Sequence, residues 1–511
     1  MSIYAYGIII AYGCLLAAVR FLVMRKFPRN NLAVREFILA GGSIPFGLLA
    51  PSVFVSWIWT TTIVGSAEAG VLYGISGGWA YSLGAIIAFG ILIALIVKIR
   101  RLMPGGITFL DFAGSRYSPL MRDVFMLFSV LVIIYLTAEQ AAGIALVFDG
   151  IFGVSFKMIA FFTVMLAGVY VVSSGLRGVL YNELFNFFII SIGILAFAAA
   201  ITGKFDLGTM YEGLKQVQSD PSNVNYNPEA LDFFSRSGIM YAFSAIIIAL
   251  GQICLDPAYY VKSYIAKDEK TMIRSFVVAG ILFWTPVAVI SAFVIGYVSL
   301  SENIDLKSAV NLSIDLSTKI LQSEFAPQIQ LLFAALIFCI GITSIIHCLV
   351  GIQSIFTIGF YSSKLNPGAT ELEQLRFGRT VAFMIAFLCA LIAISLENVS
   401  LLTIDTFSGI FFAATCGATF AGILSGKEFG SRALVSIIAG IIAGFVSWGL
   451  TGDADMKWFY GSLYSFAIPI ALMFILSVST GRRFNFMRLL MFRYDFEKEN
   501  ENARDDAGRS V

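Results

Sequence analysis

Polar and acidic side chains interrupt several apolar stretches of this chain, and these residues could bind a solute or an ion. One stretch holds Gln252 and Asp256-Pro257, followed by Tyr259 and Tyr260. A carboxylate inside a bilayer is costly and usually marks a cavity or a pathway, and the proline opens the hydrogen-bond ladder of a helix. An acceptor among flat aromatic walls suits a solute that donates hydrogen bonds. We therefore expect Asp256 to shape a binding site, with Gln252 and the two tyrosines near it.

Hydroxyl groups mark two further stretches and predict a cation site. Ser56 and the threonines at 60–62 lie in the apolar stretch 40–73, which is too long for one uninterrupted span. A helix interrupted within a membrane frees backbone carbonyls, which can hold a cation, although a packing interface of small polar residues gives the same pattern. Thr343 and Ser344 lie in another stretch, where their oxygens either bind Na⁺ or bond to the preceding helical turn. The spacing alone leaves both alternatives open.

Other motifs exclude several classes of function. The chain has no G-x-x-x-x-G-K-[ST] phosphate loop, no H-E-x-x-H motif and no Cys/His cluster. His347 is the only histidine, and the net charge is +2. We therefore expect no enzyme, no ATP-driven pump, no organic cofactor and no nucleic-acid partner, which leaves a transporter or a channel. Glu139, Glu183 and Asp405 are further acids within or at the ends of apolar stretches.

The composition places most of the chain in a lipid bilayer. It is 58% hydrophobic and 13% charged, with a mean hydropathy of +0.86, whereas a soluble domain has about 25% charged residues. A helix needs about 20 apolar residues to cross a hydrocarbon core of ~30 Å, and it satisfies its own backbone groups. We predict thirteen spans, at 3–24, 40–73, 78–98, 124–148, 158–176, 179–202, 237–261, 275–299, 327–360, 380–397, 400–424, 433–451 and 459–480.

The distribution of Lys and Arg predicts the orientation of these spans. With the N-terminus outside and the C-terminus inside, 27 of the 34 Lys and Arg residues fall on the inner side, Lys262 among them. This bias is what the positive-inside rule expects of a multi-pass protein, and we expect the cell membrane as its location.

Three ordered motifs resemble the sodium:solute symporter family. Residues 37–45 read F-I-L-A-G-G-S-I-P, similar to the family's F-x-A-G-R-S-L-P. Residues 73–78 are similar to Y-x-x-G-x-S-G-x, and residues 174–186 to G-G-L-x-A-V-x-x-T-D-x-x-Q. Within the family, residues 56–59 and 251–260 are most similar to the urea permease branch, with its Q-W-T-W and G-N-V-F-C-D-Q-S-Y-W. The resemblance covers the second to the eleventh span.

The resemblance implies an all-α fold of the leucine-transporter type. Five helices are repeated with inverted topology, and alternating access occurs around a site near the bilayer midplane. The segments it implies are 1–36 for the first span and its inner loop, 37–202 for the first repeat, 203–236 for an outer loop, 237–424 for the second repeat, 425–481 for two accessory helices and 482–511 for an inner tail.

The resemblance also implies the ligands of a coupling sodium ion and of the solute. Sodium would be held by the carbonyls of Val55, Ile58 and Ile340 and by the hydroxyls of Thr343 and Ser344. The expected substrate-site residues are Trp57, Trp59, Thr61, Gln140, Gln252, Asp256, Tyr259 and Tyr260.

The sequence departs from the family at two positions beside this site. Glu183 stands where the family has Asp, and Ile346 and His347 stand where members with a second sodium site have hydroxyls. This argues against a second sodium ion. His347 then has three interpretations: a protonated imidazole that replaces that ion, a structural hydrogen bond with Glu183, or a polar residue that caps a neighbouring carbonyl.

We expect a secondary active transporter that couples sodium to the symport of a small polar organic solute. Urea is the specific candidate, although Ser56 and Pro257 replace glutamines of the urea branch beside the expected site. The alternatives are an amino acid, a carboxylate or a polyamine as the solute, a proton-coupled relative, and, less favoured, a solute channel. The sequence does not indicate an oligomeric state.

Overall fold

The computed structural model describes residues 2–27, 33–291, 316–399, 401–452 and 456–492. Within them the chain is helical, and extended backbone pairs only at two isolated bridges, between Ile44 and Ala266 and between Lys427 and Arg483. The prediction of an all-α membrane protein is therefore confirmed.

The first half of the described chain contains α1 Ser2–Lys26, α2 Val34–Leu39, α3 Phe46–Trp57, α4 Thr60–Tyr73, α5 Ile75–Leu102, α6 Phe109–Arg116, α7 Pro119–Phe152, α8 Phe156–Lys204 and α9 Leu207–Ser219. The second half contains α10 Arg236–Ile253, α11 Pro257–Ile265, α12 Glu269–Leu282, η2 Leu316–Leu321, α15 Gln322–Glu324, α16 Pro327–Ser354, η3 Ile355–Leu365, α17 Glu371–Ile394, α18 Leu401–Phe412, η4 Ala413–Thr415, α19 Cys416–Leu424, η5 Gly430–Arg432, α20 Ala433–Leu450, α21 Met456–Ser479 and α22 Met487–Leu490.

Eleven helices of the described chain are long and apolar enough to cross a membrane, and the bent pair of α3 and α4 makes a twelfth candidate. The two helices meet at an angle of 51°. Ile58 and Trp59 between them have extended backbone angles, so the helical ladder stops at Trp57 and restarts at Thr60. The interruption expected in the stretch 40–73 is therefore confirmed.

A second interruption separates α10 from α11. Asp256 caps the N-terminus of α11 by accepting a 2.9 Å hydrogen bond from the backbone N–H of Ala258. Pro257 occupies the first helical position, where its missing N–H leaves no helical bond unmade. The second half of the chain thus contains a broken stretch, as the first half does.

The helix α8 joins two stretches that the sequence separates. It has 49 residues, which at 1.5 Å per residue is ~74 Å, more than twice the thickness of a bilayer core. Gly175 breaks it, with φ 63° and ψ 179°. A Cβ at Gly175 would lie 2.9 Å from the carbonyl oxygen of Phe37, so the close approach of α2 also requires glycine.

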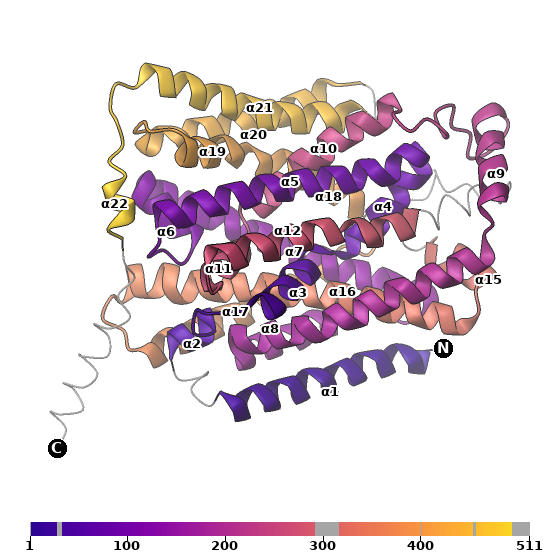
Figure 1. Ribbon diagram of the computed structural model, residues 1–511, viewed down its shortest axis with the longest axis horizontal. Helices are drawn as coiled ribbons and strands as arrows, with labels where there is room; N and C mark the ends of the chain where they lie inside the picture. The colour runs from indigo at the N-terminus through magenta and orange to yellow at the C-terminus, as the bar shows by residue number, and fades with distance from the viewer. Residues whose placement is uncertain (1, 28–32, 292–315, 400, 453–455, 493–511) are drawn as a thin grey trace.

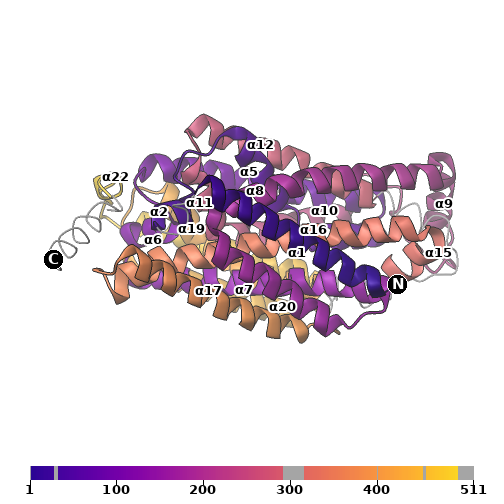
Figure 2. The same cartoon turned by 90° about the horizontal axis from the view of Figure 1, so that it is seen from below.

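The long helices lie side by side, and their connections gather at two opposite ends (Figure 1). One end carries α2, α6 and α22, and the other carries α9 and α15, in both views (Figure 2). The helix α16 is central, with 78% of its apolar window buried against 22% for α1 and 28% for α20 and α21. The core therefore forms where α16 packs between α7 and α8.

Candidate functional site

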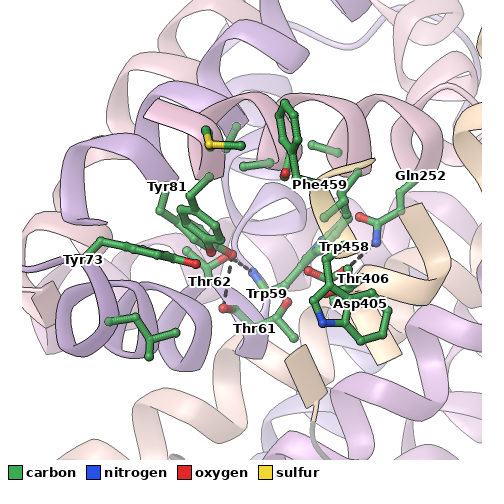
Figure 3. A pocket seen from close by; sticks show the side chains of 18 of the residues that line it. Trp59, Thr61, Thr62, Tyr73, Tyr81, Gln252, Asp405, Thr406, Trp458 and Phe459 are labelled. Atoms are coloured by element: carbon green, nitrogen blue, oxygen red, sulfur yellow. Dashed lines mark hydrogen bonds between the residues drawn. The ribbon is translucent and has the colours of Figure 1, made fainter. Parts of the chain in front are cut away.

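A cavity of about 410 Å³ lies beside both interruptions. It is bounded by the break between α3 and α4, by the end of α10 and by α5, α18 and α21 (Figure 3). Its polar and aromatic lining residues are Trp57, Trp59, Thr61, Thr62, Tyr73, Tyr81, Ser237, Tyr241, Ser244, Gln252, Phe283, Asp405, Thr406, Lys457, Trp458 and Phe459. A cavity of this size, with aromatic walls and few polar groups, suits a small polar molecule.

Trp57 forms the inner wall of the cavity. Its ring stacks on Phe89 at 4.7 Å and meets Trp59 edge-on at 5.6 Å. The side chain is only 3% exposed. Its indole N–H has no acceptor within the described part of the chain, whereas the indole N–H of Trp59 donates to the carbonyl of Ser56 at 3.0 Å. A buried donor without an acceptor is costly, so Trp57 has one hydrogen bond unmade beside the cavity.

Asp405 supplies the acceptor on the other side of the cavity. Its Oδ1 accepts hydrogen bonds from Gln252 Nε2 at 2.6 Å and from the hydroxyl of Tyr135 at 2.8 Å. The same hydroxyl lies 2.8 Å from Oε1 of Glu139. Because a hydroxyl has one proton, both contacts of Tyr135 form together only when one of the two carboxyl groups is protonated. Glu139 is fully buried behind the cavity.

The cavity contains four of the eight expected substrate-site residues: Trp57, Trp59, Thr61 and Gln252. The lining does not include Gln140, Asp256, Tyr259 or Tyr260. The side-chain oxygen of Gln140 caps α4 by accepting from the N–H and the hydroxyl of Thr60, at 2.6 and 2.9 Å. The hydroxyl of Tyr259 donates to the carbonyl of Ser56 at 3.0 Å, and that of Tyr260 to the carbonyl of Cys254 at 2.9 Å.

The structure places Asp256 outside the lining of this cavity. Its carboxylate is 1% exposed and is used by the cap of α11 and by a 2.9 Å contact with His347 Nε2. The acid that faces the cavity is Asp405, which the sequence shows only as one more acid in an apolar stretch. The Asp-Pro pair was itself the signal of a helix start, because Asp favours the cap position and Pro the first turn.

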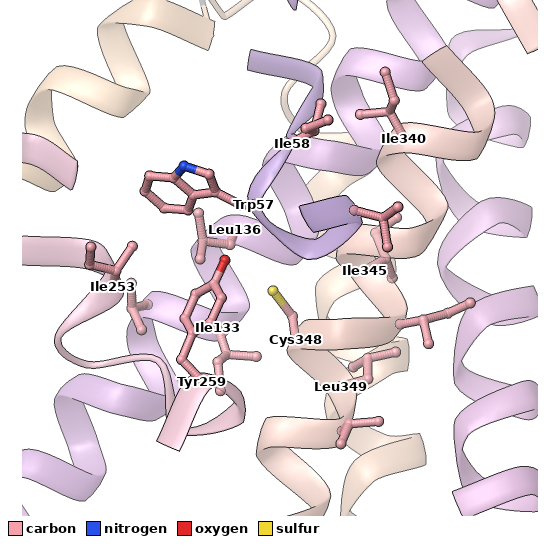
Figure 4. Packing of buried hydrophobic residues seen from close by; sticks show 14 of the residues in the cluster. Trp57, Ile58, Ile133, Leu136, Ile253, Tyr259, Ile340, Ile345, Cys348 and Leu349 are labelled. Atoms are coloured by element: carbon pink, nitrogen blue, oxygen red, sulfur yellow. The ribbon is translucent and has the colours of Figure 1, made fainter. Parts of the chain in front are cut away.

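Three of the five residues expected to hold sodium, Ile58, Ile340 and Ser344, meet where α3 ends against α16. The hydroxyl of Ser344 donates to the carbonyl of Ile58 at 3.0 Å and lies 3.2 Å from the carbonyl of Ile340. Both isoleucines are seen on the facing segments in Figure 4. Thr343 donates to the carbonyl of Cys339 at 2.6 Å, so both hydroxyls bond to their own preceding turn.

This group of oxygens fits a sodium ion. Carbonyl and hydroxyl oxygens are hard ligands, and the break after Trp57 leaves the carbonyl of Ile58 outside the helical ladder. The C-terminal end of a helix also carries partial negative charge, which favours a cation. Val55 is fully buried in the last turn of α3.

The expected contact between Glu183 and His347 is replaced by two other pairs. Oε1 of Glu183 lies 2.8 Å from Lys262 Nζ, and its Oε2 accepts a 2.5 Å hydrogen bond from the hydroxyl of Ser52. His347 pairs with Asp256 instead. The sequence places Lys262 at the inner end of a span, but its side chain is 2% exposed, because α11 begins at the break and carries it inward.

Comparisons with known proteins agree with this arrangement. The model of the sodium:solute symporter family matches residues 37–440. The probable urea active transporter 1 of Schizosaccharomyces pombe is 24% identical, over 98% of this chain and 80% of its own length. The urea-proton symporter DUR3 of Oryza sativa subsp. japonica is 22% identical, over 77% of this chain and 57% of its own length.

Solved structures show the same fold. A Na⁺-coupled sialic acid symporter in a substrate-bound, outward-open state has a TM-score of 0.71 and 18% identity, over 92% of this chain and 98% of its own. The transporter Mhp1 in a closed conformation has a TM-score of 0.52 and 12% identity, over 91% and 97% of the two chains. The protein is a multi-pass membrane transporter and not an enzyme. With the family model matching most of its length, the chain belongs to the sodium:solute symporter family.

Proposed function

We propose that this protein is a secondary active transporter in which sodium drives the uptake of a small polar solute, with urea as the specific candidate. Alternating access would take place around the cavity between the two broken stretches. The name of the Schizosaccharomyces pombe relative, a urea active transporter, supports the choice of solute.

The pairing of donor and acceptor in the cavity carries this proposal. The unpaired indole N–H of Trp57 suits a carbonyl oxygen, and the carboxyl group of Asp405 suits amide N–H groups. Urea has both, on a planar frame that can lie against aromatic rings. Asp405 would repel a carboxylate solute, whereas Lys457 in the same lining would attract one. An amino acid or a polyamine would use Asp405 through its ammonium group.

Sodium is the proposed coupling ion, and its ligands would be the carbonyls of Val55, Ile58 and Ile340 with the hydroxyls of Thr343 and Ser344. When bound, sodium would supply positive charge between α3 and α16. Proton coupling is the second candidate, because the relative from Oryza sativa is named a urea-proton symporter. The feature of this chain that favours proton coupling is the hydroxyl of Tyr135, which contacts the carboxyl groups of both Glu139 and Asp405.

We also propose thirteen spans in the cell membrane, with the N-terminus outside and the C-terminus inside. Two arguments support this count: the break at Gly175 divides α8 into two bilayer lengths, and α1 begins at the end opposite to α22, as an odd number of crossings requires (Figures 1 and 2). The repeats would be 37–202 and 237–424, followed by accessory helices within 425–481 and an inner tail at 482–511.

Uptake of radiolabelled urea into proteoliposomes tests the proposal. Separate sodium, proton and zero gradients would be imposed on the same preparation. Accumulation above the outside concentration under a sodium gradient alone supports sodium symport. Accumulation under a proton gradient alone supports the second candidate, and equilibration without accumulation would indicate a channel. No urea flux under any gradient would exclude urea as the solute.

A further inference from the structure

A buried ion pair joins three helices outside the solute cavity. Lys262 of α11 and Glu183 of α8 are 2% and 0% exposed, with 2.8 Å between Nζ and Oε1. Nζ of Lys262 also donates to the carbonyl oxygen of Ser52 in α3, at 3.1 Å. The hydroxyl of Ser52 donates to the other carboxylate oxygen of Glu183. The ammonium group thus lies between a carboxylate and a backbone carbonyl in the middle of α3.

Stability does not account for such a pair. Charged groups inside a membrane are rare, and they mark functional sites more often than structural ones. A buried ion pair can often be replaced by well-packed apolar residues without loss of stability, whereas removing one partner is strongly destabilising. The location of this pair therefore needs a functional reason.

That location adjoins the proposed sodium ligands from two sides. Ser52 lies one helical turn before Val55 in α3. Glu183 lies one turn before Asn186 in α8, and Nδ2 of Asn186 donates to the hydroxyl of Thr343 at 2.5 Å. The ammonium group of Lys262 thus lies beside α3, one helical turn before the proposed sodium ligand Val55.

The nearby pair of Asp256 and His347 does not compete for Lys262. Asp256 is the nearest further acid described near it, and its Oδ2 lies 2.9 Å from His347 Nε2 while its Oδ1 caps α11. Glu183, in contrast, would be an uncompensated buried charge without Lys262, because its other described partner, Ser52, is neutral.

We propose that Lys262 is a resident cation: its ammonium group supplies, beside Glu183 and the carbonyl of Ser52, the positive charge that a second coupling ion would otherwise bring. It is tethered to α11, so it stays with the protein through the transport cycle. The transporter then takes up a single coupling cation. Only this last count rests on the sodium site proposed above; the role of Lys262 beside Glu183 does not.

The thermal stability of the purified protein tests the proposal without any solute. Melting temperatures would be measured at pH 8.5 against increasing NaCl, with choline chloride holding the ionic strength constant. The variants are Lys262→Gln, Lys262→Arg and the double variant Glu183→Gln with Lys262→Gln. A cation that binds only the folded protein raises its melting temperature in proportion to the number of ions bound.

We expect the Lys262→Gln variant to gain one sodium ion. Where the parent binds one sodium ion, the slope of melting temperature against the logarithm of sodium concentration should about double in this variant. If the sodium proposal fails, the melting temperature of the parent will not depend on sodium concentration. In that case only the Lys262→Gln variant should show such a dependence. The Lys262→Arg and double variants should match the parent. A proton taken in place of sodium would stabilise the single variant on acidification to pH 6.5, more than the parent, and would equally support the proposal.

A Lys262→Gln variant that responds to sodium and pH as the parent does would overturn it, as would a double variant with the same gain. If Lys262→Gln does not fold, the double variant is compared with Glu183→Gln. The Glu183→Gln variant keeps the buried ammonium group of Lys262 without its carboxylate, whereas the double variant has neither charge. A resident cation requires the double variant to melt at a higher temperature than Glu183→Gln. A double variant that melts no higher than that single variant refutes the role.

Discussion

The replacement of Asp405 by Asn tests the cavity most directly. The side-chain oxygen of Asn can still accept from Gln252 and Tyr135, at the positions that Oδ1 of Asp405 occupies. The second oxygen becomes an NH₂ group, which faces the N–H groups of the solute as a donor. The change removes a hydrogen bond to a charged group, worth about 1.5–3 kcal/mol. The KM for urea uptake should therefore rise about 10- to 150-fold.

The assay is the initial rate of sodium-driven urea uptake by proteoliposomes over a range of urea concentrations. Glu139→Gln is the matched control, because Glu139 also contacts the hydroxyl of Tyr135 at 2.8 Å but does not line the cavity. We expect its KM to stay within a few-fold of the parent value, as for a site without direct contact. If Asp405→Asn has the same KM as the parent, at unchanged protein amount and melting temperature, this cavity is not the solute site.

Three further predictions concern the sodium site, the histidine and the kink. Replacing Thr343 and Ser344 together by Ala should abolish the stimulation of uptake by sodium at unchanged expression, and uptake equally fast in choline medium would contradict a sodium site. His347→Gln should keep the parental shape of the uptake profile from pH 5.5 to 8.5, since Gln can still donate to the same carboxylate; a flattened profile would show that the imidazole proton takes part. Gly175→Ala should lower the melting temperature by several degrees, because it adds about 1–3 kcal/mol of backbone strain. Gly90→Ala, in an open helical position, should not lower it.

The sequence predicts the helical stretches and their interruptions because these depend on local chemistry. Ser56 and the threonines at 60–62 flank the break between α3 and α4, and the Asp256-Pro257 pair starts α11. Both signals lie within a few residues of the feature they predict. Bilayer thickness limits helix lengths in the same way: the sequence separates two stretches after residue 176, and α8 is broken nearby, at Gly175.

The partners of the buried acids could not be predicted from the sequence in the same way. Asp405 meets Gln252 from a helix more than a hundred residues earlier, and Glu183 meets Lys262 rather than His347. A shift of one residue along a helix turns a side chain by about 100°, since there are 3.6 residues per turn. The stretch that contains an acid is therefore predictable, whereas the neighbour it faces depends on how the breaks rotate and offset each half-helix.

Three backbone carbonyls, two in α3 and one in the break after it, accept hydrogen bonds from α11 and α16. The carbonyls of Ser52 and Ser56 accept hydrogen bonds from Lys262 and Tyr259, which both belong to α11. The carbonyl of Ile58 accepts a hydrogen bond from Ser344 of α16. The contacts to α11 are made by side chains that stay with the protein. The contact to α16 is made at the place where sodium is proposed to bind and leave. We therefore expect α3 and α11 to move as one body while the distance between α3 and α16 follows sodium occupancy. Spin labels on the ends of these three helices would measure both distances with and without sodium, and equal changes in the two would contradict this division.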